Sequence, residues 1–390
     1  MLNFPLGYYT VNDRIFASKL EAVIWATDNG FPDLKWNFND ELFNKLDWTS
    51  EPDTSIEEYY KIRAQQIREK YDYVVVMYSG GADSTNILMS FLNNGIHIDE
   101  IVVGAPLSGL NNWTYNNKNF DVTNILSETK FAQLEFIEYV HSHWPNVKIT
   151  INDYFLEMLE WKDGSWINDC FNFINPSVAR HSLNKLHHIK DLAEQGKKIA
   201  KVYGMDKPIL AISETNNIYT VFNDTPLGIM QHASTKERYP NLEPVAFYWS
   251  PDLPQLMIKQ AHVLSRWIMR PENAQVLKVM WYTTDPLSWQ TSERRLSDYH
   301  RSIVPCIYPN QSNRNAFQTD KALSNESSFA QDKTWFSDNH SDIQVTQIIN
   351  DDISNLLKKI DKKYMSPVYN KTLMPHRKYF KIGHVDKFKL

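Results

Sequence analysis

The chain is poor in cysteine and has no long apolar run. Its 390 residues include two cysteines, Cys170 and Cys306. Two thiols are too few for a disulfide-stapled scaffold and are typical of a reducing compartment. No stretch approaches the roughly 18 uninterrupted apolar residues of a membrane span, and residues 1–16 lack the features of a secretory signal. We therefore expect a soluble, cytoplasmic protein with no membrane partner.

The chain also lacks an excess of positive charge. It has 41 Lys and Arg against 46 Asp and Glu, which gives a formal net charge of −5. Proteins that coat nucleic acid without sequence preference are normally basic, and no basic stripe stands out here. We therefore expect no extensive non-specific nucleic-acid binding. The hydrophobic fraction of 42% is ordinary for a globular protein of one elaborated domain or a few packed ones.

Residues 1–70 have the pattern of a small α/β preface. A hairpin is predicted at 8–17, followed by an amphipathic helix at 19–27 that stops before Gly30. Residues 55–70 carry acids early and bases late, which favours a solvated helix.

Residues 71–240 alternate between buried strands and helices. The run YVVVMY at 73–78 is typical of a strand buried on both faces of a parallel sheet. A helix at 84–94 and a strand at 98–104 complete a βαβ unit. The further predicted elements are a helix at 122–143, a strand at 147–153, a helix at 186–196, a strand at 199–204 and a strand pair at 209–213 and 219–222. The pattern predicts a doubly wound, mainly parallel, Rossmann-like α/β sheet.

The strand signal fades in residues 241–390, for which we predict a mainly helical lobe with helices at 253–269 and 351–362. Residues 304–345 are polar and rich in turn formers.

The Trp-rich, irregular stretch at 155–183 is interpreted as an insertion that faces the substrate.

The most specific motif is Ser-Gly-Gly-Ala-Asp-Ser at residues 79–84, between a predicted strand and a predicted helix. Adjacent glycines let the main chain approach an anion closely and adopt positive φ. Backbone N–H groups then converge on a phosphate at the positive end of the helix. The predicted nucleotide-binding residues of this loop are Ser79, Gly80, Gly81, Ala82, Asp83, Ser84 and Thr85. Asp83 has two interpretations: it braces or caps the loop, or it reaches a phosphate-bound Mg²⁺.

Chance does not account well for this motif. S-G-G-x-D-[ST] should occur in a chain of this length about once in 10³ sequences, before its flanking elements are required. The Walker A motif G-x-x-x-x-G-K-[ST] and the dinucleotide fingerprint G-x-G-x-x-G are both absent.

The strand–SGGADS–helix arrangement resembles the PP-loop ATP pyrophosphatases, which have the adenine nucleotide alpha hydrolase-like fold. This superfamily includes the synthetase domain of asparagine synthetase and the phosphoadenosine phosphosulfate reductases. The resemblance covers about 71–225, and the whole chain is similar to phage-encoded members labelled reductase-like. It implies an enzyme that binds ATP and Mg²⁺, releases pyrophosphate and adenylates a small molecule or a tRNA or nucleoside substrate. An amine or another nucleophile then displaces AMP, in the host cytoplasm if the protein is phage-encoded.

The same resemblance places further residues near the nucleotide. Val103 and Gly104 end the second strand, where such folds hold adenine or ribose. Gly204 lies at the sheet edge. Asp206 would help to hold Mg²⁺, and Lys207 would neutralise the departing pyrophosphate. The alternative for Asp206 and Lys207 is a turn with a solvated charge pair. Together with Asp83, these two are the predicted catalytic residues.

Two other features have a functional and a structural interpretation. The aromatic turn at 248–252 (YWSPD) forms either a substrate wall or a structural corner, in which Ser250 or Asp252 caps the next helix. Arg180 and His181 either contact an anionic substrate or lie on the surface.

Missing sequence features also exclude several subfamilies of this superfamily. Position 2 is Leu, so the cysteine of an amidotransferase is missing, and two cysteines cannot build a four-cysteine zinc site. Neither Cys170 nor Cys306 has the E-C-G-x-H context of a sulfonucleotide reductase. An adenylating enzyme is therefore preferred over a reductase-like enzyme, which needs an exposed cysteine facing the loop. A non-catalytic nucleotide-binding module is the second alternative, and homo-oligomer formation stays open.

Overall fold

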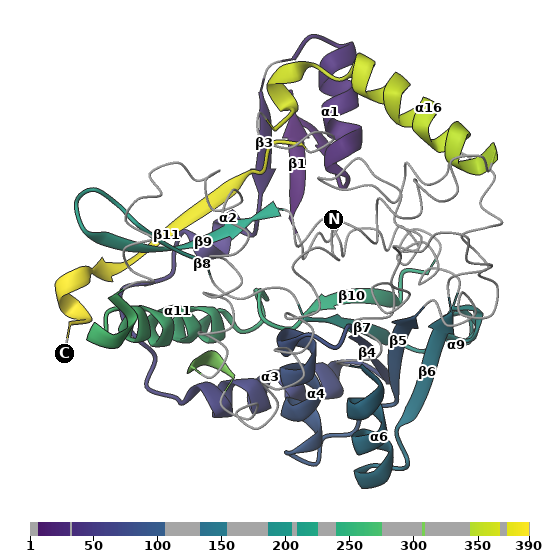
Figure 1. Ribbon diagram of the computed structural model, residues 1–390, viewed down its shortest axis with the longest axis vertical. Helices are drawn as coiled ribbons and strands as arrows, with labels where there is room; N and C mark the ends of the chain where they lie inside the picture. Colours follow the sequence, from purple (N-terminus) through teal and green to yellow (C-terminus); the bar gives the residue numbers. More distant parts are fainter. Residues whose placement is uncertain are drawn as a thin grey trace, which may run out of the picture.

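The computed structural model in Figure 1 shows an α/β protein with one five-strand parallel sheet and two small antiparallel sheets. The structure describes residues 7–31, 33–105, 133–153, 186–204, 209–224, 239–274, 306–308, 344–366 and 373–389, without the side chains of 344–350 and 352. The predicted insertion at 155–183 lies outside these ranges. Most of the polar stretch at 304–345 and the first part of the helix predicted at 122–143 also lie outside them.

The parallel sheet runs in the order β10 (Leu242–Ala246), β7 (Ile199–Tyr203), β4 (Tyr73–Tyr78), β5 (Glu100–Ala105) and β6 (Lys148–Asp153). All four neighbouring pairs are parallel. The chain moves outward from β4 through β5 to β6, then returns to the other side of β4 for β7 and β10. The strand order therefore reverses between β4 and β7, as in the predicted doubly wound sheet.

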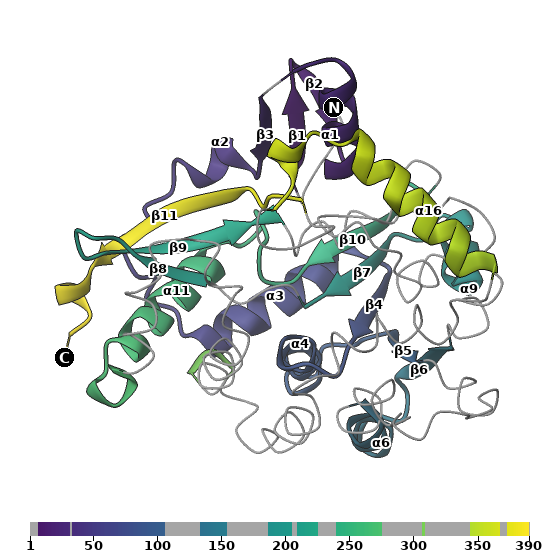
Figure 2. The ribbon, with the colours of Figure 1, turned by 45° about the horizontal axis from the view of Figure 1, so that its top comes forward.

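Helices cover both faces of this sheet (Figure 2). α4 (Ala82–Leu92), α6 (Leu134–His143) and α3 (Ile56–Lys70) share one hydrophobic core with Val74 and Val76 of β4. On the opposite face, α9 (His187–Glu194) packs over Val75 and Met77. Alternate residues of β4 thus enter different cores, which explains why its sequence is apolar throughout.

The prediction of a solvated helix at 55–70 was wrong for one face of α3. Ser55 caps the helix, but Tyr60, Ala64 and Ile67 are buried in the core. These residues follow a spacing of three and four that places them on one side of a helix. The charged residues of this helix, of which only Arg63 is buried, obscured this stripe.

The N-terminal preface is a three-strand antiparallel sheet with one helix. Its order is β2 (Arg14–Phe16), β1 (Tyr8–Val11) and β3 (Leu34–Asn37), and α1 (Lys19–Asp28) packs beside it. The predicted hairpin and helix are confirmed, whereas β3 was not predicted. A short helix, α2 (Asp40–Phe43), follows β3.

The second antiparallel sheet joins distant parts of the chain. Its order is β11 (Arg377–His384), β9 (Asn217–Asn223) and β8 (Ile209–Ile212), and β11 lies along β9 in both views (Figures 1 and 2). The region after 240 also contains α11 (Pro254–Ile268), α16 (Gln344–Lys359) and the short 3-10 helices Pro271–Asn273, Lys362–Tyr364 and Val385–Lys387. The strands described in this region, β10 and β11, were not predicted. Pro244 interrupts the pattern of β10, which is tolerated because β10 is an edge strand.

Among the described helices, none combines the length and the apolar character that a membrane span requires.

Candidate functional site

The predicted phosphate loop lies at the carboxyl end of β4 and at the start of α4. Gly80 has a φ of 79°, in the left-handed region that favours glycine. Gly81, the N-cap of α4, has φ −78° and ψ 163°, which any residue can adopt. The prediction that both glycines allow positive φ therefore holds only for Gly80. A Cβ added at Gly81 would have Ser79 Oγ, 3.4 Å away, as its nearest neighbour, so the space beside Gly81 is open.

The loop hydroxyls hold the loop itself together. Thr85 Oγ1 and Ser84 Oγ donate to the Gly81 carbonyl over 2.9 and 3.1 Å. The Ser79 N–H donates to Ser84 Oγ over 3.3 Å. Ser84 and Thr85 are buried, and Ser79 is exposed. The positive end of the α4 dipole points at this loop, which favours an anion there.

Asp83 is fixed by two buried tyrosines. The Tyr308 hydroxyl donates to Asp83 Oδ1, and the Tyr248 hydroxyl donates to the Asp83 carbonyl over 2.8 Å. Both tyrosines have no exposed surface. Of the two interpretations of Asp83, this arrangement favours the loop brace.

Gly204, which follows β7 directly, closes the other side of the site. A Cβ at Gly204 would lie 2.8 Å from Ser84 N and 3.0 Å from the Asp83 carbonyl carbon, so the main chain at 204 packs directly on the start of α4. Because β4 and β7 flank the point where the strand order reverses, the phosphate loop and Gly204 border the crevice where doubly wound sheets bind ligands.

The remaining predicted nucleotide contacts lie on β5. Val103 is buried and pairs with Tyr78, the last residue of β4, and Gly104 is half-buried. The parallel register therefore brings both to the edge of the sheet that carries the phosphate loop.

Several predicted site residues cannot be placed, because they lie outside the described residues. They are Asp206, Lys207, Arg180, His181 and Cys170. Among the residues that the structure does describe, no group of three His, Cys, Asp or Glu side chains could hold a metal ion. A Mg²⁺ ion at the loop would therefore depend on the Asp83 carboxylate, phosphate oxygens and water, the ligand set that Mg²⁺ commonly takes with nucleotides.

The aromatic turn at 248–252 is a structural corner. Tyr248 and Trp249 are fully buried, and Asp252 is paired with Arg63 of α3 over 3.3 Å. Leu253 is the N-cap of α11 and makes no side-chain capping bond, so the predicted capping by Ser250 or Asp252 was wrong. One contact of the turn was not predicted, namely the hydrogen bond from Tyr248 to the Asp83 carbonyl.

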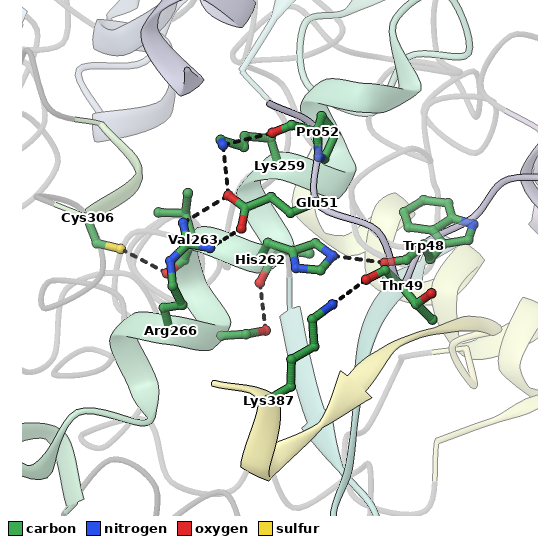
Figure 3. A network of polar contacts seen from close by, with 12 residues as sticks. Trp48, Thr49, Glu51, Pro52, Lys259, His262, Val263, Arg266, Cys306 and Lys387 are labelled. Atoms are coloured by element: carbon green, nitrogen blue, oxygen red, sulfur yellow. Dashed lines mark hydrogen bonds and ion pairs between the residues drawn. The ribbon is translucent and has the colours of Figure 1, made fainter. Parts of the chain in front are cut away.

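Cys306 is half-buried and belongs to a polar network around α11 (Figure 3). Its thiol points at the Val263 carbonyl, 3.7 Å away, and burial raises the pKa of Cys306 to about 11. The same network contains a Glu51–Lys259 ion pair of 2.8 Å and a bond of 3.0 Å between His262 Nε2 and the Trp48 carbonyl (Figure 3). These contacts join the 48–52 loop to α11. The raised pKa leaves Cys306 a poor thiolate nucleophile near neutral pH.

Comparison of the chain with protein-family models and with curated proteins finds no match. The resemblance to the PP-loop ATP pyrophosphatases therefore rests on the loop motif and on its place in the parallel sheet.

Proposed function

We propose that the protein binds ATP at residues 79–85 and cleaves it between the α- and β-phosphates, adenylating an acceptor substrate. The observation that carries this proposal is the Ser-Gly-Gly-Ala-Asp-Ser loop at the carboxyl end of β4, beside the strand-order reversal. The open space next to Gly81 supports it, because a phosphate needs that close approach to the main chain.

In this proposal the loop supplies position and charge. The main chain at Gly80 and Gly81 and the positive end of α4 face the triphosphate. Val103 and Gly104 border the adenine or ribose. When bound, Mg²⁺ would neutralise phosphate charge, with Asp83 as its protein ligand in the described part of the chain.

Catalysis would come mainly from orientation. The acceptor oxygen is held in line with the α-phosphate, and the pyrophosphate leaves toward the loop, whose dipoles stabilise its developing charge. Asp206 and Lys207, which follow Gly204 directly, are proposed to assist that departure. The acceptor is proposed to be a small molecule or a tRNA or nucleoside, and an amine or another nucleophile then displaces AMP.

The sulfonucleotide reductase alternative has weaker support. It needs a reactive thiolate that faces the loop, whereas Cys306 is a half-buried thiol with a raised pKa that points at α11. Cys170 is then the only cysteine that could supply this thiolate. The non-catalytic nucleotide-binding module has no observation in its favour, but it is an outcome of the same test.

The test is pyrophosphate release from ATP and Mg²⁺, screened against amino acids, nucleosides and tRNA. Release that depends on one acceptor supports the proposal and identifies the substrate. Nucleotide binding without release under every condition would instead favour the binding module. If thiol alkylation of the protein abolishes activity, the reductase-like alternative gains support.

A further inference from the structure

We propose that Tyr308 is a positioning residue of the phosphate loop, and that the segment 306–308 acts as a brace for the first turn of α4. The effect of this brace on nucleotide binding rests on the proposed function, whereas its effect on the loop does not. The brace joins residues 225 positions apart in the sequence.

The contact to Asp83 is a charge-assisted hydrogen bond from a buried donor. Tyr308 and its neighbour Ile307 have no exposed surface, and the Tyr308 hydroxyl donates to Asp83 Oδ1. Bonds of this type are shorter and stronger than neutral ones, and water competes little for a donor that is fully buried.

A second phenol holds the main chain of the same residue. Tyr248 donates to the Asp83 carbonyl over 2.8 Å and accepts from Asn86 Nδ2 over 3.0 Å. The rings of Tyr248 and Tyr308 are 5.6 Å apart, so the two donors form one packed unit. Side chain and main chain of Asp83 are therefore fixed together, which restricts the rotation of the first turn of α4.

The brace is itself anchored to the helices behind it. The Tyr60 hydroxyl of α3 donates to the Ile307 carbonyl, and Gln260 of α11 donates to Tyr60 over 3.1 Å. Cys306 contacts the Val263 carbonyl of α11 over 3.7 Å. The phosphate loop is thus supported from a core that includes α3 and α11 as well as its own strand and helix.

The brace also controls where a negative charge lies. The Tyr308 hydroxyl holds Asp83 Oδ1, and a carboxylate released from this bond would no longer keep a fixed position at the start of α4. We therefore expect loss of the Tyr308 hydroxyl to loosen the loop and to weaken anion binding there.

The test compares Tyr308→Phe with Tyr71→Phe. Tyr71 is a matched control because it is also buried and its hydroxyl also donates to a carboxylate, Glu243 Oε2, at 2.6 Å. In the unliganded protein we expect amide hydrogen exchange at 82–85 to become about tenfold faster in Tyr308→Phe and to stay unchanged in Tyr71→Phe. Unchanged exchange in Tyr308→Phe, or equal acceleration in both variants, would overturn the proposal.

A second measurement, titration with ATP and Mg²⁺, addresses binding. We expect Tyr308→Phe to raise the Kd about tenfold and Tyr71→Phe to leave it unchanged. An unchanged Kd in Tyr308→Phe, with a wild type that binds, also contradicts the positioning role. If the wild type does not bind ATP, the proposed function fails, and the exchange experiment still decides whether Tyr308 braces the loop.

Discussion

Two charged residues near the candidate site, the half-buried Asp83 and the buried Lys201, are held in opposite ways. Asp83 has tyrosine donors, whereas Lys201 on β7 is 2% exposed and its side-chain ammonium has no hydrogen bond or ion pair within the described part of the chain. Burial alone lowers the pKa of Lys201 from 10.5 to about 8. Its register neighbours are Val75 and Pro244, which offer no counter-charge. An ammonium that stays charged in such surroundings destabilises the fold unless a partner outside the described residues compensates it.

Lys201→Met should therefore stabilise the protein. Below pH 8 the wild type carries the full penalty, which the difference between 10.5 and about 8 sets at up to about 3 kcal/mol. Between pH 8 and 10.5 the unfolded chain binds a proton that the folded chain does not, so wild-type stability should rise with pH. Urea unfolding at pH 7 and pH 9.5 measures both effects.

The control for Lys201→Met is Lys61→Met, because the Lys61 side chain is 38% exposed and its removal should change little. Destabilisation by Lys201→Met at pH 7 would show that a partner for this ammonium exists elsewhere in the chain.

Single site residues could be predicted from the sequence only where neighbouring residues form a motif. The six residues of the loop form a rare motif, so they could be identified directly. Tyr308 and Tyr248 could not, because they lie 225 and 165 positions from Asp83 and no motif surrounds them. Lys201 looked like an ordinary strand residue, since burial of a single position depends on the packed sheet.

Among the elements, α3 contributes the contact that holds the end of β10. Arg63 is buried, and its guanidinium donates to the carbonyls of Ala246 and Phe247 over 3.0 and 3.1 Å. It also reaches Asp252, whose side chain is 51% exposed. The two buried carbonyls depend on Arg63 more than the exposed carboxylate does.

Arg63→Met should reduce the free energy of unfolding by about 2–5 kcal/mol, because two buried carbonyls lose their donors. Asp252→Asn should change it by less than about 1 kcal/mol, since an exposed ion pair contributes little. Chemical denaturation of both variants measures the difference. Equal losses would mean that the ion pair, and not the carbonyl contacts, is what Arg63 provides.

Element prediction succeeded where a continuous apolar run decides the structure, as in β4 and β5. It failed at β11, where Lys378 and Lys381 break the run, because this strand gains its burial from one partner, β9. The apolar face of α3 was overlooked for a similar reason: a stripe of buried residues between many charges becomes evident only against its packing partners.

Over the whole molecule, one buried cluster connects the N-terminal sheet to the C-terminal strand. Asp224 has no exposed surface and pairs with Lys19 of α1 at 2.5 Å. It also accepts from the Tyr9 hydroxyl over 3.0 Å and from the His376 N–H over 3.1 Å. Burial alone would raise the pKa of Asp224, but Lys19 and His376 outweigh it and hold the pKa well below its usual range.

Asp224→Asn should destabilise the protein by about 3–5 kcal/mol, because it leaves the Lys19 ammonium buried without its counter-charge. Thermal and urea unfolding measure the loss. Asp386→Asn is the control, since Asp386 pairs with Lys389 at the surface and its loss should have no measurable effect. A neutral result for Asp224→Asn would show that the two sheets are held together without this cluster.

The architecture of the parallel sheet followed from the sequence because alternating strands and helices permit few topologies. The pairing of β9 with β11, across about 150 residues, could not be predicted, since no local pattern encodes which distant strand completes a sheet. The predicted domain boundary at residue 240 also separated β10 from the parallel sheet to which it belongs.

The most direct test of the central claim is titration of wild type and Gly81→Ala with ATP and Mg²⁺, with thermal unfolding measured in parallel. The backbone at Gly81 accepts alanine and the added Cβ meets only Ser79 Oγ at 3.4 Å, so we expect an unchanged or slightly higher Tm. A phosphate bound in that space would collide with the methyl group, so we expect at least about tenfold weaker binding. Equal ATP binding by both proteins, or none by the wild type, would contradict a nucleotide site at this loop.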